Sequence, residues 1–346
     1  MSKKVKIKDL YIGGGNPIAI QSMATCRPSD LNASISCLQE LENAGCDIIR
    51  FAILDSEDAQ SIKKLKKYTK MPIVADIHFD YRLAIESIKN GADKIRINPG
   101  NIGAKENVEK VAKVLKEYNI PVRVGSNTGS IDKEYLQKYG RSEISLGESA
   151  LKNVAILEKF GIDNIVISVK ASDTRLTVNS YKYISKKTDY PLHLGVTEAG
   201  TEYSGIIKNS IAMGSLLLSG IGDTIRVSLS APPIKEVIAG KKILSSLGLK
   251  NEGVRIIACP TCGRCAWDCM EFAKYVEENT MHVKKPITIA IMGCAVNGPG
   301  EAKEADVGIA GDKDKNVIFA GGKIVKTVNK EDAKKVFFEE IEKCLQ

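Results

Sequence analysis

One rhythm runs through the sequence from residue 18 to about residue 246: an apolar, β-branched run, a polar or glycine-containing turn, then an amphipathic helical pattern. The rhythm occurs eight times. The predicted strands are Ile18–Met23, Ile48–Ile53, Ile73–Ile77, Lys94–Ile97, Val122–Gly125, Ile165–Val169, Leu192–Val196 and Thr224–Leu229. The predicted helices lie at 30–44, 56–69, 80–90, 105–118, 147–160, 174–187, 204–218 and 233–246. Eight such units predict an α/β fold in which parallel strands close into a TIM (β/α)8 barrel.

An open, doubly wound sheet is the alternative, because it shows the same alternation of strands and helices. No Gly-x-Gly-x-x-Gly motif opens the first predicted helix, and the number of units is that of the barrel. The closed form is therefore favoured. The run Gly13-Gly14-Gly15 precedes the first predicted strand, and we interpret it as a hairpin turn ahead of the barrel.

The length of the chain predicts more than one domain. At 346 residues it exceeds the size of most single hydrophobic cores. Leu247–Gly253 has the character of a linker, and the pattern after it differs from the barrel rhythm. We expect a substrate-binding barrel over residues 1–247 and a small α+β domain over residues 253–346.

The distribution of charge and hydropathy argues against several partners. The formal net charge is +8, but the lysines are scattered without a dense basic run, so no nucleic acid is expected. No apolar run reaches the roughly 18 residues of a membrane span. The basic N-terminus is not followed by the apolar stretch of a signal peptide, so the chain is expected in the cytoplasm.

Barrel active sites lie at the C-terminal ends of the strands, and these ends are strongly polar here. Five cations fall there, Arg50, Arg96, Arg123, Lys170 and Arg226. The carboxylates near them are fewer, mainly Asp76, Glu198 and Asp223. Each arginine could pair with one of these, but five converging cations together predict a ligand with two phosphates or a diphosphate. Glu198 is a candidate acid–base or hydroxyl-binding group, whereas His78 and His193 fit a structural role as well as a catalytic one.

Nine cysteines occur, and five of them lie in one short region toward the C-terminus, at Cys259, Cys262, Cys265, Cys269 and Cys294. Thiolates at this density predict a metal centre, either zinc or an iron–sulfur cluster. The second Cys-x-x-Cys pair of many structural zinc sites is missing. The first four have the spacing of bacterial ferredoxins, but Met270 stands where those proteins have proline. Helical character over Trp267–Glu278 would turn Cys269 away from a cluster, so we expect a buried helix residue there.

A second apolar strand offers other ligands. It carries Cys294 to its end, and a Gly-Pro-Gly turn then brings Glu301 back beside it. Three thiolates and one carboxylate would hold a 4Fe-4S cluster with one weakly held iron.

Six motifs are spread over nearly the whole chain: Gln-Ser-Met at 21–23, Arg-Ile-Asn-Pro-Gly-Asn at 96–101, Arg-Val-Gly-x-Asn at 123–127, Leu-Gly-Val-Thr-Glu-Ala-Gly at 194–200, Cys-Pro-Thr-Cys-Gly-Arg at 259–264 and Gly-Cys-x-Val-Asn-Gly-Pro-Gly-Glu at 293–301. With these motifs the chain resembles the family of 4-hydroxy-3-methylbut-2-enyl diphosphate synthases in its bacterial, two-domain form. The resemblance implies a 4Fe-4S cluster in the second domain, with the ligands Cys259, Cys262, Cys294 and Glu301. Cys265 stands where the family pattern requires no cysteine.

The resemblance also implies a reaction: reductive ring opening and dehydroxylation of 2-C-methyl-D-erythritol 2,4-cyclodiphosphate to (E)-4-hydroxy-3-methylbut-2-enyl diphosphate, with two electrons delivered through the cluster. Glu198 and Glu301 would be catalytic, and the substrate would be bound by Arg50, Arg96, Arg123, Asn127, Lys170, Arg226 and Ser228. Ferredoxin or flavodoxin would donate the electrons, and a head-to-tail homodimer is implied. The alternatives are a barrel transferase on a phosphorylated substrate with a structural zinc domain, and a non-enzymatic iron–sulfur carrier.

Overall fold

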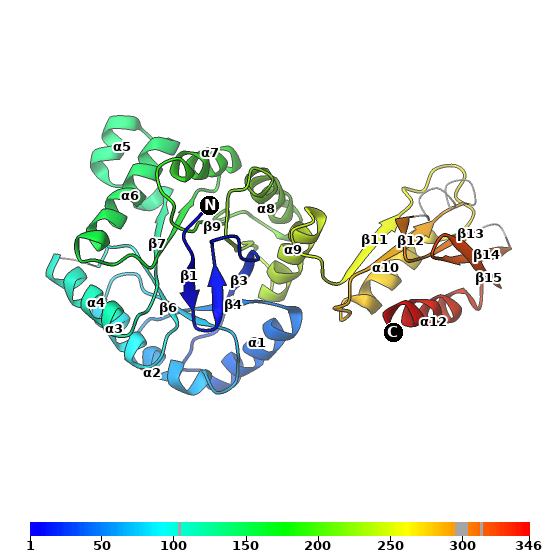
Figure 1. Ribbon diagram of the computed structural model, residues 1–346, viewed down its shortest axis with the longest axis horizontal. Helices are drawn as coiled ribbons and strands as arrows, with labels where there is room; N and C mark the ends of the chain where they lie inside the picture. Colours follow the sequence, from blue (N-terminus) through cyan, green and yellow to red (C-terminus); the bar gives the residue numbers. More distant parts are fainter. Residues whose placement is uncertain (103–104, 295–303, 312–313) are drawn as a thin grey trace. The chain divides into compact units, whose positions relative to one another are not determined.

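A computed structural model describes residues 1–102, 105–294, 304–311 and 314–346 of the chain (Figure 1). These residues form two compact units, Met1–Lys250 and Asn251–Gln346. In the described residues, no helix combines the length and the apolar character that crossing a membrane would need.

The first unit is a TIM barrel, as the sequence predicts. Its strands are β3 (Ala19–Met23), β4 (Ile48–Ala52), β5 (Ile73–Asp76), β6 (Lys94–Ile97), β7 (Val122–Asn127), β8 (Ile165–Lys170), β9 (His193–Leu194) and β10 (Thr224–Ile225). All neighbours are parallel, in the order β8-β7-β6-β5-β4-β3-β10-β9. A parallel bridge between Ile167 and Leu192 joins β8 to the residue before β9 and closes the ring.

Two barrel strands are shorter than predicted. The ladder ends at Leu194 in β9 and at Ile225 in β10, although the sequence predicts strands to Val196 and Leu229. Beyond these ends the two backbones crowd each other, because a Cβ atom on Gly195 would lie 2.8 Å from the Arg226 carbonyl oxygen. A glycine is therefore required where the two segments approach each other.

Helices surround the strands, namely α1 (Leu31–Ala44), α2 (Ser56–Leu65), α3 (Tyr81–Lys89), α4 (Lys105–Glu117), α5 (Lys133–Tyr139), α6 (Glu143–Lys159), α7 (Thr174–Ser185), α8 (Glu202–Leu217) and α9 (Pro233–Ser246). The sequence prediction missed α5 and began α6 four residues late. The missed signals were caps: the Asp132 side chain accepts from the Glu134 N–H at the start of α5, and Ser142 and Ser145 form a capping box at the start of α6.

A two-stranded hairpin lies across the end of the barrel at which the strands begin, which we call the lower end, and it stands in front of the barrel in Figure 1. It pairs β1 (Val5–Ile7) with β2 (Leu10–Ile12), and its apolar side chains pack on an apolar layer of the barrel strands that includes Ile48, Val74 and Val166. The chain does turn at Gly13–Gly15 ahead of the barrel, as predicted, but these glycines do not form the hairpin turn, which lies at Lys8 and Asp9 between β1 and β2. The positive φ angles of the glycines reverse the chain after β2 and before it enters β3.

The second unit is a five-stranded mixed sheet with helices. Its strands are β11 (Val254–Ala258), β12 (Ile287–Met292), β13 (Val307–Gly311), β14 (Lys315–Ala320) and β15 (Lys323–Asn329), in that order across the sheet. Strands β11, β12 and β13 are parallel to one another, and β14 pairs antiparallel with β13 on one side and with β15 on the other. Helices α10 (Cys269–Thr280) and α12 (Ala333–Leu345) pack on the sheet, with the rings of Phe272 and Phe337 5.7 Å apart in the core.

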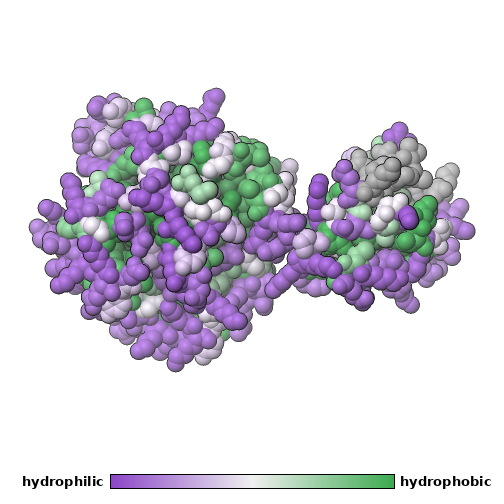
Figure 2. Space-filling view, viewed as in Figure 1, coloured by the Kyte–Doolittle hydropathy of each residue, from purple (hydrophilic) through white to green (hydrophobic). Residues whose placement is uncertain are grey.

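One helix of the barrel unit carries an apolar stripe on its exposed side (Figure 2). Tyr203, Ile207, Ile211 and Leu218, on α8 and directly after it, are 43–78% exposed. Between Lys208 and Asp223 the sequence contains no charged residue. A stripe of this kind is unusual on a monomer surface and typical of a contact with another protein.

We expect Gly13→Ala to destabilise the barrel unit by about 1–3 kcal/mol, because Gly13 has φ +70° and an added Cβ atom would strike the Lys3 carbonyl oxygen. Urea unfolding followed by circular dichroism measures the change. Gly214→Ala on α8 is the matched control, since a Cβ atom meets nothing within 4 Å there, and it should leave the stability unchanged or slightly raised. Equal stability of the Gly13 variant and the wild-type protein would contradict the packing described here.

Candidate functional site

The two faces of the barrel strands carry different chemistry. In β4, Ile49 and Phe51 belong to the hydrophobic core shared with the helices, whereas Ile48 belongs to the cluster that packs on the hairpin. Strand periodicity therefore turns Ile48 and Arg50 into the barrel. The same alternation places Val74 and Asp76 on the inner side of β5. The lower interior is thus apolar, while the upper interior is polar.

Six cations gather in the upper interior, and we call them the cationic cluster: Arg50, Lys94, Arg96, Arg123, Lys170 and Arg226. Five of the six are residues that the sequence predicted for this end of the barrel. The sixth, Lys94, was not predicted. It is fully buried on β6, and its Nζ lies 3.5 Å from the Gln21 Oε1.

Asp76 at the end of β5 is one of two carboxylates that hold this cluster. Its side chain is 4% exposed, and its oxygens lie 3.6 Å from the Arg50 Nε and 3.1 Å from the Arg96 Nη1. Burial alone would raise the pKa of Asp76. The Arg50 guanidinium, a hydrogen bond with His78, and the Arg96 and Arg123 guanidiniums outweigh burial and hold the pKa well below its usual value.

Glu236 is the second carboxylate, and the sequence reasoning missed it. It lies in the first turn of α9, is 3% exposed, and accepts hydrogen bonds from the Arg226 Nε and Nη2 at 3.2 and 3.0 Å. It also accepts from the Ser22 hydroxyl and the Leu229 N–H. Asp223 had been expected in this role. Asp223 directly precedes β10 and instead accepts from the Leu192 N–H, just before β9, and from the Ser2 hydroxyl in the N-terminal segment, at the lower end of the barrel.

The other three cations have no such counter-charge. In the part of the chain that the structure describes, no carboxylate lies within ion-pairing distance of Lys94, Arg123 or Lys170, and the Arg123 Nε and Nη1 have no hydrogen-bond partner. Burial and then the neighbouring guanidiniums lower the pKa of all three well below the ordinary values. Buried donors without partners are costly, so this interior is built to receive an anion.

His193 lies against the same cluster. It is fully buried on β9, its Nδ1 is 2.8 Å from the Thr224 hydroxyl, and its Nε2 has no partner among the described residues. Burial, followed by the charges of Lys170 and Arg123, lowers its pKa well below the usual value. The ring is therefore a neutral group under the cations and adds no positive charge of its own.

Three further predicted residues, Ser228, Asn127 and Glu198, lie at the upper strand ends or in the loops that follow them. The Ser228 hydroxyl accepts from the Arg226 Nη1 at 2.7 Å, and Asn127 pairs with Lys170 in the register of β7 and β8. Glu198 lies in the loop after β9, is exposed, and has a φ of 52°. A non-glycine residue in the left-handed region is uncommon and is concentrated at functional sites.

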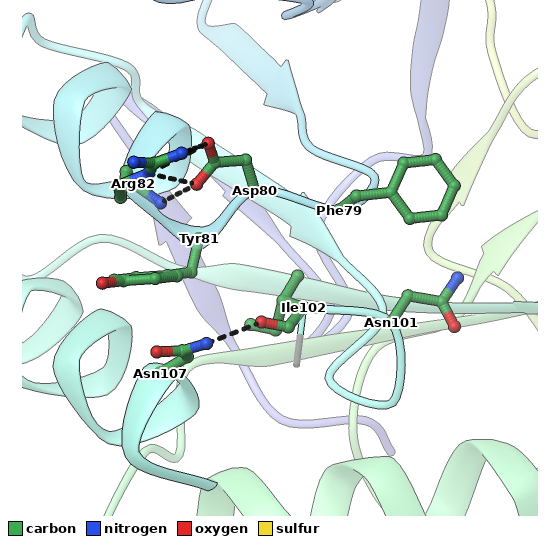
Figure 3. Close-up of a pocket in the computed structure, with 7 residues that line it drawn as sticks. All are labelled: Phe79, Asp80, Tyr81, Arg82, Asn101, Ile102 and Asn107. Atoms are coloured by element: carbon green, nitrogen blue, oxygen red, sulfur yellow. Dashed lines mark hydrogen bonds and ion pairs between the residues drawn. The ribbon is translucent and has the colours of Figure 1, made fainter. Parts of the chain in front are cut away.

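A pocket of about 420 Å³ lies in the loops that follow β5 and β6 (Figure 3). Its polar groups are largely satisfied within the pocket wall: Arg82 pairs with Asp80, and the Asn107 Nδ2 donates to the Ile102 carbonyl oxygen at 3.4 Å. Phe79 is 74% exposed at its edge. The pocket lacks the unpartnered cations of the barrel interior.

Five of the six cysteines of the second unit, all except Cys344 on α12, lie where strands β11 and β12 end, and we call this place the cysteine edge. The parallel strands β11 and β12 are in register, with Ala258 opposite Ile291, so their carboxyl ends lie side by side. Cys259 follows β11, and its N–H donates to the Ile291 carbonyl oxygen at 2.9 Å. Cys294 follows β12 and is buried, whereas Cys262 is exposed. Two of the three predicted thiol ligands, Cys259 and Cys294, therefore lie at neighbouring strand ends. The third, Cys262, is presented to solvent on the loop that follows β11.

Two other cysteines belong to the same loop. Cys269 begins α10 and is 2% exposed, as predicted for a buried helix residue, and its Sγ lies 3.5 Å from the Cys265 Sγ. Glu301, the predicted fourth ligand, lies outside the described residues. Among the residues that are described, no three histidine, cysteine or acidic side chains are close enough to hold a metal ion. The ligand set therefore stays a prediction, and the soft donors at this edge fit iron–sulfur chemistry.

Comparison with known proteins identifies the family. A family model described as the GcpE TIM-barrel domain matches residues 2–241, and one described as the GcpE protein C-terminal domain matches residues 255–343. The chain belongs to the GcpE family. The resemblance found in the sequence motifs is thereby confirmed.

Curated GcpE relatives match the chain over its whole length. A protein of Caldanaerobacter subterraneus subsp. tengcongensis, named 4-hydroxy-3-methylbut-2-en-1-yl diphosphate synthase (flavodoxin), is 54% identical, and the match covers 100% of this chain and 98% of the relative. A protein of the same name from Clostridium perfringens is 52% identical, with 96% and 95% covered.

Solved structures resemble the GcpE barrel in fold. The dihydropteroate synthase of Xanthomonas albilineans matches with a TM-score of 0.51 at 12% identity, covering 72% of this chain and 98% of that one. A truncated 3-deoxy-D-arabino-heptulosonate 7-phosphate synthase from Thermotoga maritima matches with a TM-score of 0.50 at 18% identity, covering 72% and 94%. At these identities the likeness concerns the fold alone.

We expect Glu236→Ala to lower the free energy of unfolding of the barrel unit by about 3–5 kcal/mol, because Arg226 would keep its charge beside the other cations without a partner. Inorganic diphosphate should restore part of the loss by supplying negative charge. Glu202→Ala is the control: its pair with Lys235 at 3.3 Å is half exposed, and its loss should cost about 0–1 kcal/mol. Thermal unfolding with and without diphosphate measures both variants, and equal losses would rule out a special role for Glu236.

Proposed function

We propose that this chain is a 4-hydroxy-3-methylbut-2-en-1-yl diphosphate synthase of the non-mevalonate isoprenoid pathway. It would convert 2-C-methyl-D-erythritol 2,4-cyclodiphosphate to (E)-4-hydroxy-3-methylbut-2-enyl diphosphate with two electrons and loss of water. The observation that carries the proposal is the excess of cations inside the barrel, two of which, Arg96 and Arg123, lie within the family motifs. Full-length relatives of about 50% identity that carry this enzyme name support it.

The unpartnered donors of the barrel interior are the proposed diphosphate site. Arg123 and Lys170 would bind phosphate oxygens directly, since their charges have no carboxylate partner in the described part of the barrel. Arg50 and Arg96 would share their charge between Asp76 and the ligand, and Arg226 would be aimed by Glu236. Asn127 and Ser228 would bind hydroxyl or phosphate oxygens.

Glu198 is the proposed acid–base group of the barrel. Glu198 is exposed in the loop after β9, at the end of the barrel where the cations gather, and its backbone is held in an unusual conformation. A carboxylate in this position can pass a proton to a departing hydroxyl group while the cations hold the phosphates in place. The fully buried His193 is a supporting residue in this proposal.

Cys259, Cys262, Cys294 and Glu301 would hold a 4Fe-4S cluster in the domain spanning residues 253–346. The cluster supplies the electrons one at a time when bound, and Glu301 is then the proposed catalytic member of the ligand set. Flavodoxin is the proposed donor, because it appears in the names of the relatives, and ferredoxin would serve the same purpose.

We further propose a cytoplasmic homodimer with a head-to-tail arrangement. Self-association would bury the exposed apolar stripe of α8, which bears few charges that would oppose a contact. In this dimer, each subunit would bind substrate in its own barrel, over residues 1–247.

Turnover of the cyclodiphosphate by anaerobically purified protein with a chemical reductant tests the proposed activity. We expect a brown protein with iron and acid-labile sulfide in equal amounts, and formation of the open-chain diphosphate detected by mass spectrometry. Zinc without sulfide would favour the alternative, a barrel transferase with a structural zinc domain. Arg123→Met should abolish turnover while leaving the iron content unchanged, because the barrel and the cysteine edge belong to separate units.

Substrate binding should be accompanied by proton uptake in the pH range between the pKa of Lys170 in the free protein and its pKa in the complex. Burial and nearby guanidiniums lower the pKa of Lys170, and an anion beside it favours the charged form, so the pKa rises on binding and a proton enters. The affinity should therefore fall as pH rises. Calorimetry in buffers of different ionisation enthalpy measures the number of protons taken up. The uptake can be assigned to the protein, because the cyclodiphosphate has no group that titrates near neutral pH.

Lys170→Met should bind more weakly and take up fewer protons than the wild-type protein. Lys152→Met is the matched control, since Lys152 is exposed and pairs with Asp132 and Glu134 away from the cluster. A buffer-independent binding enthalpy for the wild-type protein would show that the buried cations are already charged before the ligand arrives.

A further inference from the structure

Cys265 and Cys269 form a thiol pair for which the proposed ligand set has no use. Their Sγ atoms are 3.5 Å apart, close to van der Waals contact and within reach of each other by small side-chain rotations. A disulfide needs about 2.05 Å, so the two sulfurs would have to approach by roughly 1.5 Å. No carboxylate or histidine joins them in a metal-binding group within the described residues.

The surrounding loop holds this pair in place. The Ala266 N–H donates to the Gly293 carbonyl oxygen at 2.9 Å, and the Trp267 Nε1 donates to the Met292 carbonyl oxygen at 2.9 Å. These bonds fasten the loop to the end of β12. Both sulfurs face the same backbone atom: a Cβ atom on Gly293 would lie 2.8 Å from the Cys265 Sγ and 3.2 Å from the Cys269 Sγ.

The two sulfurs differ in access. Cys269 is 2% exposed, whereas Cys265 is only partly buried. A reagent from solvent therefore reaches Cys265 first, and Cys269 is positioned behind it as the resolving thiol. An accessible thiol with a resolving partner in contact is the arrangement of reversible redox sites.

We propose that Cys265 and Cys269 are a reversible oxidation site that forms a disulfide with low-molecular-weight disulfides, separately from the thiols assigned to the cluster. The Cys265 thiolate attacks the external disulfide, forms a mixed disulfide and releases one small thiol. Cys269 gives its proton to solvent, attacks the Cys265 sulfur and releases the second small thiol. Two protein thiols are oxidised, and one external disulfide is reduced to two thiols.

The bond would tie the start of α10 to the turn that carries Cys262. That turn is closed by a hydrogen bond from the Cys265 N–H to the Cys262 carbonyl oxygen at 2.9 Å. Oxidation would thus fix the loop in the arrangement seen here and leave Cys259, Cys262 and Cys294 in their proposed role as cluster ligands. The inference stands on the contact between the two sulfurs and does not depend on the proposed reaction.

The test treats anaerobically purified full-length protein with oxidised glutathione, alkylates the remaining thiols and maps the peptides by mass spectrometry. We expect a linked Cys265–Cys269 peptide, lighter by two hydrogen atoms, which dithiothreitol reverses. Cys265→Ser should remove the linkage. Cys269→Ser should instead hold a stable glutathione adduct on Cys265, whereas a mere packing role for Cys269 would leave this adduct on the wild-type protein as well.

Cys26 and Cys37 in the barrel unit also contact each other, so the intact mass alone does not identify the bond. Cys37→Ser is therefore the matched control and should retain the Cys265–Cys269 peptide. The iron content should stay constant during oxidation. Three outcomes would overturn the proposal: recovery of both cysteines as free thiols, a link from Cys265 to Cys259 or Cys262, and loss of iron in step with the linkage. Each holds whether or not the protein turns over the cyclodiphosphate.

Discussion

Two buried carboxylates hold together a barrel interior that is filled with positive charge. Asp76 neutralises part of the charge of Arg50 and Arg96, and Glu236 fixes Arg226 through two hydrogen bonds. The apolar layer below them, sealed by the hairpin, keeps water away from the lower interior and so strengthens every charge interaction above it. The remaining cations have no carboxylate partner in the described residues, so a bound anion would stabilise them, which ties the stability of the site to its ligand.

The sequence could predict the barrel because its signal is local. Strand periodicity and strand-end polarity located Arg50, Arg96 and Arg123 without knowledge of tertiary structure. Glu236 was missed because it lies on a helix, and only the closed ring places the start of α9 over β10. Lys94 was missed because it opens a strand rather than ending one. The hairpin turn was misplaced because three consecutive glycines are a stronger turn signal than Lys8 and Asp9, which nevertheless make the turn.

The cysteine edge shows a different limit of sequence reasoning. The prediction that Cys269 is a buried helix residue is confirmed, because helical periodicity after Trp267 was visible in the sequence. The meeting of Cys259 and Cys294 depends on the parallel pairing of β11 and β12, which join residues about 30 positions apart. The spacing of Cys259, Cys262, Cys265 and Cys269 matches the ferredoxin pattern. Spacing alone therefore could not show which cysteines come together in the fold.

The barrel site also illustrates how function opposes stability within one fold. Replacing Arg123 and Lys170 by apolar residues of similar size would remove buried charges that have no protein partner in the described residues, and such replacements commonly stabilise a core. Their presence therefore needs a reason outside folding. A polyanionic ligand provides it, because each phosphate oxygen satisfies donors that were desolvated when the chain folded. Such a site binds without waiting for side chains to reorganise, and it selects ligands by how many charges they bring.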